Sequence, residues 1–207
     1  MDYKNFFLRS IFSIIFILFY YIITITNFYL VYILILLIYI IIFIEVFYNF
    51  KKNKFFPILY ISLSLAFFLM TDFNNRNYLI FNLFIIVVII FDIFSYLIGK
   101  LFGKTKLIKI SPNKTVEGLL GGFIFSFISS LIFLFIFDLI INTKLILFII
   151  IIILFSFFGD IIESFYKRKN NLKNSSEFIP GHGGVFDRFD SFLFAIIPYS
   201  IFTNILL

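Results

Sequence analysis

The sequence predicts an all-α protein: a polytopic transmembrane helical bundle of about seven spans, with its N-terminus inside and its C-terminus outside (N-in/C-out). Its 207 residues are 62% hydrophobic, whereas a soluble domain is about 45–50% apolar. The apolar residues form long stretches, and the basic residues collect in alternate loops between them. Lipid is therefore the expected solvent for most of the chain.

Seven apolar stretches approach the length of about 20 residues that a helix needs to cross about 30 Å of hydrocarbon. They cover residues 10–26, 28–48, 55–70, 78–99, 118–141, 144–162 and 189–207. Only Thr26 and Asn27 separate the first two, which predicts a tight hairpin or one long broken helix. The third is short and starts near Pro57. The first has no small-residue cleavage site, so we expect a retained signal anchor.

The charges support this topology. With the N-terminus inside, 15 of the 17 lysines and arginines lie on the inner side, and only Arg76 and Lys144 lie outside. This bias follows the positive-inside rule. It predicts a multi-pass protein of the cell inner (cytoplasmic) membrane whose active site faces the cytoplasm.

Glycine divides the chain into two parts. All nine glycines lie between Gly99 and Gly184, and glycine marks close backbone approach and unusual backbone angles. We therefore expect residues 1–91 to be N-terminal transmembrane anchor and scaffold helices. Residues 92–207 are expected to form a catalytic transmembrane domain with two cytoplasmic motif loops. No internal repeat is visible, which argues against a transporter.

A first group of polar residues begins at Asp92, which shares one helical face with Ser95, Tyr96 and Gly99 at positions i, i+3, i+4 and i+7. An acidic residue at membrane depth is costly and marks a functional hypothesis. The alternative is an acid that reaches the surface or pairs with a nearby lysine.

The loop that follows carries Ser111, Lys114, Thr115 and Glu117 just before a helix that opens with Gly118. Free N–H groups at a helix start, beside lysine and hydroxyl side chains, suit phosphate. The other interpretation is a capping box, in which Thr115 or Ser111 caps the helix and Glu117 lies in its first turn. Both interpretations can hold together.

A second and denser group starts with Asp160, Glu163, Ser164 and Lys167, which again share one helical face. Its remaining candidate residues are Arg168, Lys173, His182, Gly183, Gly184, Asp187, Arg188 and Asp190. Acids in this number, interleaved with lysines and glycines, favour function over packing. Two further acids in apolar stretches, Glu45 and Asp138, lie near helix ends and are expected to reach the surface or to be paired.

The residue types indicate the chemistry. The chain has no cysteine, which excludes disulfides and thiolate metal sites, and its single histidine excludes a multi-histidine site. Carboxylates favour a hard cation, so the predicted cofactor is Mg²⁺, alone or with a second cation. The neighbouring lysines and arginines suit phosphate groups. His182 either contacts phosphate, acts as an acid or base, or holds its glycine-rich turn.

The run from Ser164 to Asp190 resembles the signature of the phosphatidate cytidylyltransferase (CDP-diacylglycerol synthase) family, and residues 92–118 resemble that family's second motif. Together these motifs cover about half of the chain. The resemblance implies that CTP and phosphatidic acid give CDP-diacylglycerol and pyrophosphate. Tyr166 and Asn174 depart from the family pattern, and Asn174 replaces an aspartate.

The resemblance also implies roles. Asp160 and Asp187 match the family's metal ligands, and Lys167 and Arg168 complete the expected catalytic set. The expected substrate-binding residues are Asp92, Lys104, Ser111, Lys114, Thr115, Glu117, Glu163, Ser164, Lys173, His182, Gly183, Gly184, Arg188 and Asp190. The expected partners are CTP, phosphatidic acid and the lipid bilayer, with no nucleic acid, and a homodimer is compatible. The rival interpretations are a CTP-dependent polyprenol-type lipid kinase and a non-enzymatic scaffold.

Overall fold

The computed structural model describes Tyr20, Thr24 and residues 27–71, 78–108, 111, 114–178 and 183–206. Within these residues there are helices and no strand, which confirms the all-α class. The helices are α2 (Phe28–Asn49), α3 (Phe55–Leu69), α4 (Tyr78–Phe102), α5 (Val116–Ile136), α6 (Thr143–Lys169) and α7 (Phe186–Leu206). The expected span 10–26 lies almost wholly outside the described residues.

Three helices start at a polar cap. The side chain of Asn27 accepts a hydrogen bond from Tyr29 N (2.9 Å), and that of Asn142 accepts from Leu145 N (2.8 Å). Thr115 caps α5 in the same way, at 3.1 Å from Gly118 N. Such caps satisfy N–H groups that the first helical turn leaves unpaired. The helix start after Asn27 and the expected cap at Thr115 are thus both present.

Four of the described helices, α2, α4, α5 and α6, are long and apolar enough to cross a membrane, and α3 is a shorter apolar helix of 15 residues. Most helix ends lie within three residues of the prediction, and two differ by five or more. α5 stops at Ile136 instead of residue 141, because Asp138 takes a left-handed conformation (φ 49°) that closes the helix. α6 runs on to Lys169, seven residues past the expected end, so its charged end is helical.

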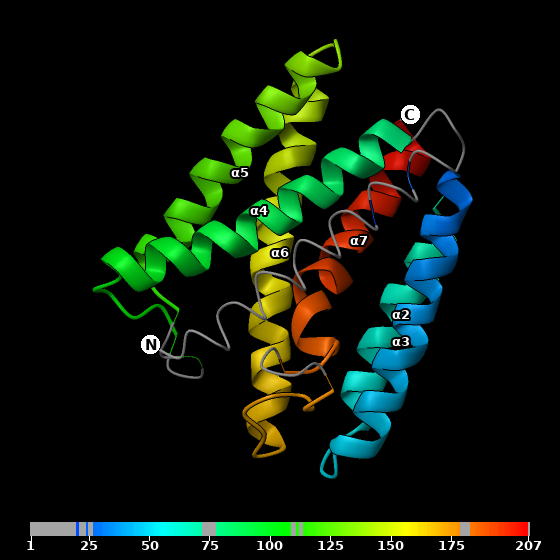
Figure 1. Cartoon of the computed structure of the whole chain (residues 1–207), viewed down its shortest axis with the longest axis vertical. Helices are drawn as coiled ribbons and strands as arrows, with labels where there is room; N and C mark the ends of the chain where they lie inside the picture. Colours follow the sequence, from blue (N-terminus) through cyan, green and yellow to red (C-terminus); the bar gives the residue numbers. More distant parts are fainter. Residues whose placement is uncertain are drawn as a thin grey trace.

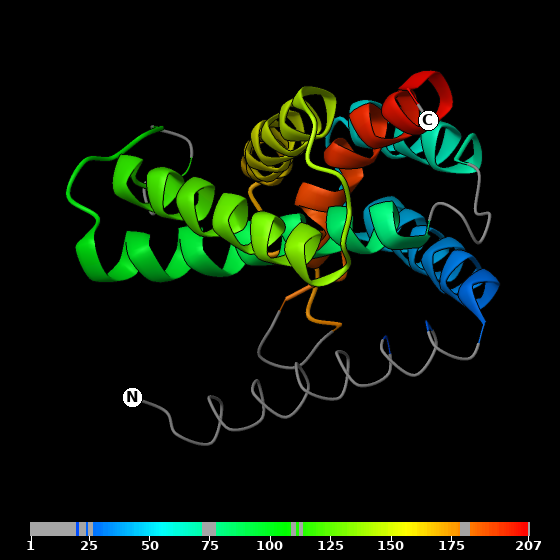
Figure 2. The ribbon, with the colours of Figure 1, turned by 90° about the horizontal axis from the view of Figure 1, so that it is seen from above.

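Helix α7 is the centre of the bundle, since it contacts α2, α3, α4 and α6. Seen from above, α4 and α5 run together on one side, and α2 and α3 lie on the other (Figure 2). The α4–α5 contact is close because Gly121 and Gly122 have no side chain: a Cβ at Gly121 would lie 2.6 Å from Ile98. Small residues allow this approach where lipid replaces water.

Candidate active site and metal centre

The candidate site forms where the C-terminal part of α6 meets the start of α7, at the lower end of the bundle in Figure 1. Asp160 and Glu163 come from α6, and Asp190 comes from α7. One carboxylate oxygen of each lies within 4.8 Å of those of the other two. Gly159 makes this approach possible, because a Cβ there would lie 2.4 Å from the backbone oxygen of Asp190.

Lys167 links this cluster to the carboxylate of Asp187. Its Nζ lies 2.7 Å from Glu163 Oε2 and 2.7 Å from Asp187 Oδ1. The Glu163 side chain is 1% exposed and that of Asp187 is 8% exposed. An ion pair withdrawn from water in this way depends on both partners, since removal of one leaves a buried charge.

Asp187 is further held by the backbone. Its Oδ2 accepts hydrogen bonds from Ser175 N (3.0 Å) and Gly184 N (2.9 Å). Gly183 has φ 83°, and a Cβ there would lie 2.5 Å from Asp187 Oδ2, so this turn requires glycine. Burial raises the pKa of Asp187, but hydrogen bonding, which includes the bonds from Lys167 Nζ and Gly184 N, outweighs burial and lowers the pKa to about 2. Asp187 is therefore an anion at neutral pH.

Two contacts bring the two sequence motifs together. Lys114 Nζ, from the loop before α5, lies 2.7 Å from Asp160 Oδ1 on α6. Asp92 Oδ1, on α4, accepts a hydrogen bond of 2.7 Å from Ser191 Oγ on α7. The structure thus places Asp92 and Lys114 of the first motif beside residues of the second motif.

Glu117 organises the loop that carries Lys114. Its carboxylate accepts hydrogen bonds from Lys104 N (3.1 Å) and Thr105 N (3.2 Å), and Lys106 pairs with Thr115 in an isolated bridge. The side chain of Lys104 is exposed. Glu117 therefore holds the loop backbone in this structure, and Thr115 caps α5 as the capping interpretation expects.

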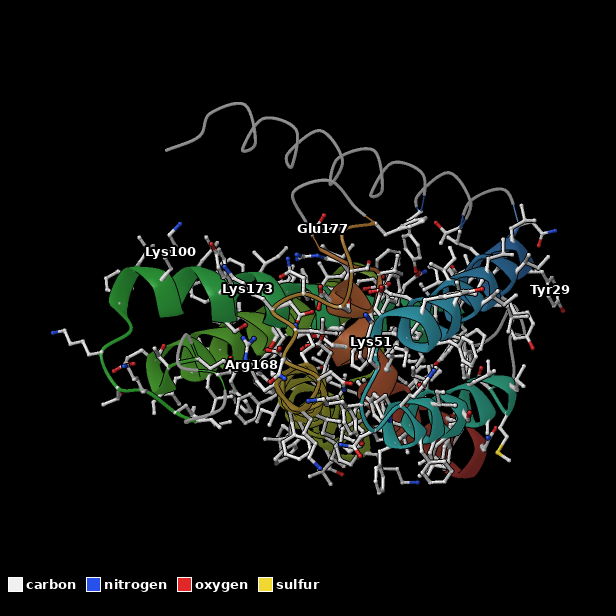
Figure 3. The ribbon with its side chains drawn as sticks, turned by 90° about the horizontal axis from the view of Figure 1, so that it is seen from below. Tyr29, Lys51, Lys100, Arg168, Lys173 and Glu177 are labelled. Carbon is white, nitrogen blue, oxygen red and sulfur yellow. The ribbon has the colours of Figure 1, made fainter. Side chains whose placement is uncertain are left out.

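The other expected residues lie around the cluster. Ser164 is buried and Ser111 is half-buried, whereas Arg188 is exposed. Arg168 donates to the backbone oxygen of Leu172 (2.8 Å). Figure 3 shows Arg168, Lys173 and Lys51 on the face seen from below. Lys173 and Lys51 line a cavity of about 660 Å³ beside the loop that follows α6. His182 lies outside the described residues.

Sequence reasoning missed Ser175 and Ser191, which bind Asp187 and Asp92, and it also missed the place of Glu45. Glu45, on α2, is 6% exposed and accepts hydrogen bonds from Val185 N (2.8 Å) and Phe186 N (3.2 Å). We expected Glu45 either to reach the surface or to be paired. In the structure it is paired, and its partners are backbone N–H groups at the start of α7. The available signal was that Glu45 is the single acidic residue between positions 3 and 71.

The fold and the site together define a helical membrane protein with a buried cluster of carboxylates and lysines, suited to a cation and to phosphate groups. The family model described as "Cytidylyltransferase family" matches residues 5–206. The chain belongs to this family, which confirms the resemblance seen in the motifs.

Curated relatives carry a more specific name. The chain is 38% identical over 157 residues to the phosphatidate cytidylyltransferase of Staphylococcus haemolyticus, and 37% identical over 157 residues to that of Staphylococcus aureus. It is 39% identical over 159 residues to that of Staphylococcus saprophyticus. Each alignment covers 70% of this chain and 60% of the relative. The chain thus spans about 60% of the length of these relatives.

Proposed function

We propose that this chain transfers CMP from CTP to phosphatidic acid, which gives CDP-diacylglycerol and pyrophosphate for phospholipid biosynthesis. The observation that carries the proposal is the meeting of Asp160, Glu163 and Asp190, with Lys114 and Lys167 in direct contact with two of them. This arrangement suits a metal-bound triphosphate. The name shared by the curated relatives supports the same reaction.

The donor set fits Mg²⁺. Three carboxylates within 4.8 Å repel one another unless a cation or proton neutralises them, and Mg²⁺ prefers oxygen ligands. The ion would be held by Asp160, Glu163 and Asp190. The resemblance also implies Asp187 as a ligand, and Asp187 is linked to Glu163 by Lys167, which contacts both carboxylates. The bound ion would neutralise charge on the phosphates of CTP and polarise the α-phosphorus.

The chain itself supplies position and positive charge. Lys114 and Lys167 lie where they can neutralise phosphate oxygens next to the carboxylates. A phosphate oxygen of phosphatidic acid attacks the α-phosphorus of CTP and forms a new P–O bond. The bond from that phosphorus to the bridging oxygen breaks, and pyrophosphate leaves with the electron pair. The attacking phosphate is already anionic, so correct placement replaces a general base.

The lipid substrate suits the membrane setting. With seven spans and the N-terminus inside, the carboxylate cluster lies at the cytoplasmic surface of the inner membrane, where CTP is available. Phosphatidic acid remains in the inner leaflet with its phosphate at that surface. Lys51, Arg168 and Lys173 add positive charge to the face where α6 ends, which attracts both anionic substrates.

Product analysis tests the reaction. Purified chain is incubated with phosphatidic acid and CTP labelled in its α-phosphate, with and without Mg²⁺. We expect label in the lipid and one pyrophosphate per lipid formed, both only with Mg²⁺. A CTP-dependent lipid kinase would instead transfer the γ-phosphate and release CDP. Lipid that stays unlabelled by α-labelled CTP rejects the proposal.

Single-residue variants test the ligand assignment. Asp160→Asn is expected to lower the rate by about 100-fold or more, since Asp160 would hold the metal ion, and Asp187→Asn should do the same, since Asp187 holds Lys167 beside the cluster. The matched control is Asp138→Asn, because Asp138 is exposed in the turn after α5. If Asp160→Asn inserts normally and keeps the rate of the control, Asp160 is not a metal ligand.

A further inference from the structure

Glu45 lies in α2, but its carboxylate contacts the backbone at the start of α7. Its Oε2 accepts hydrogen bonds from the N–H groups of Val185 (2.8 Å) and Phe186 (3.2 Å), 140 and 141 residues further along the chain. The start of a helix has unpaired N–H groups and a positive end charge, so a carboxylate there is favourable. Glu45 therefore caps α7 from another helix.

The neighbouring glycine makes room for this carboxylate. A Cβ at Gly184 would lie 1.7 Å from Glu45 Oε1 and 2.1 Å from Ser175 Oγ. Both oxygens are buried and lack a hydrogen bond within the described part of the chain. A side chain at position 184 would thus displace Glu45 from the turn.

The residues that surround Glu45 are those that hold Asp187. Gly184 and Ser175, which border Glu45, each donate a backbone N–H to the carboxylate of Asp187. One turn therefore lies between two carboxylates. Glu45 accepts a hydrogen bond from Val185 N, and Asp187 accepts one from Gly184 N. A movement of this turn would move Asp187 with it, and would shift the start of α7 against α6.

We propose that Glu45 is a positioning residue of the active site. It acts from the N-terminal part of the chain, holds the start of α7, and so sets Asp187 and Asp190 against the carboxylates of α6. This inference rests on the proposed function for its activity readout. It makes α2 part of the catalytic unit, where the sequence indicated only a scaffold helix.

Steady-state kinetics test the role. Glu45→Ala is expected to lower kcat at least about tenfold, since it removes two hydrogen bonds to a charged acceptor, while the KM for CTP changes less than about threefold. Glu45→Gln retains an acceptor oxygen, so its kcat should lie between Glu45→Ala and the control Asp138→Asn. A kcat of Glu45→Ala equal to that of the control overturns the proposal, and so does a Glu45→Gln value no higher than that of Glu45→Ala.

Hydrogen exchange gives a readout that does not need activity. In Glu45→Ala, amides of residues 183–190 should exchange faster than in the wild type, whereas α4 and α5 should be unchanged. Unaltered exchange in 183–190 overturns the inference. If the wild type forms no CDP-diacylglycerol, the proposed function fails, but the exchange data still decide whether Glu45 holds α7.

Discussion

Lys167 is the cation between two buried carboxylates, and its replacement by methionine removes both ion pairs at once. Each pair is 2.7 Å long, and the carboxylate partners are 1% and 8% exposed. Breaking a buried pair by removing one partner costs about 3–5 kcal/mol. We therefore expect Lys167→Met to lose at least about 3 kcal/mol of stability, or roughly 6–20 °C in Tm at 2–4 °C per kcal/mol.

The assay is the fraction of detergent-solubilised protein that stays monodisperse after heating. Lys169→Met is the matched control, because Lys169 is exposed on the same helix and such surface changes cost less than about 1 kcal/mol. The double variant Lys167→Met/Glu163→Gln should recover part of the loss, since it removes one of the two unpaired anions. The reasoning is refuted if Lys167→Met melts within a degree or two of Lys169→Met.

Three further outcomes are expected. Gly183→Ala should lower CDP-diacylglycerol formation at least about tenfold, because its φ of 83° and the nearby Asp187 exclude a Cβ; a wild-type rate contradicts this. Glu117→Gln should speed trypsin cleavage after Lys104, whose N–H it binds; an unchanged digest contradicts this. Because the pKa of Asp187 is lowered to about 2, the stability lost in Asp187→Asn should be constant from about pH 5 to 8 and shrink below about pH 4; a pH-independent difference contradicts this.

The helices were largely predictable because apolar length and polar caps are local properties of the sequence. Asn27 and Thr115 mark helix starts in the sequence and cap them in the structure. The C-terminal ends of the helices were less predictable. A left-handed residue at Asp138 stops α5 early, and α6 continues because Glu163 and Lys167 pair at i, i+4 on its charged end.

The site was predictable along each helix and less so between helices. The i, i+3, i+7 spacing correctly placed Asp160, Glu163 and Lys167 on one face. The sequence contained no information on how α7 rotates against α6, which decides that Asp190 joins Asp160 while Asp187 contacts Lys167. The role of Glu45 depends on packing across 140 residues, which local spacing does not report.

The central claim is that carboxylates of α6 and α7 hold one divalent cation, and Mn²⁺ binding measured by electron paramagnetic resonance tests it most directly. Titration of purified wild-type chain with Mn²⁺ should show a bound ion that Mg²⁺ displaces. The variant Asp160→Asn/Asp190→Asn should lose that binding, whereas Asp138→Asn should keep it. Equal Mn²⁺ binding by the wild type and the double variant would contradict the account.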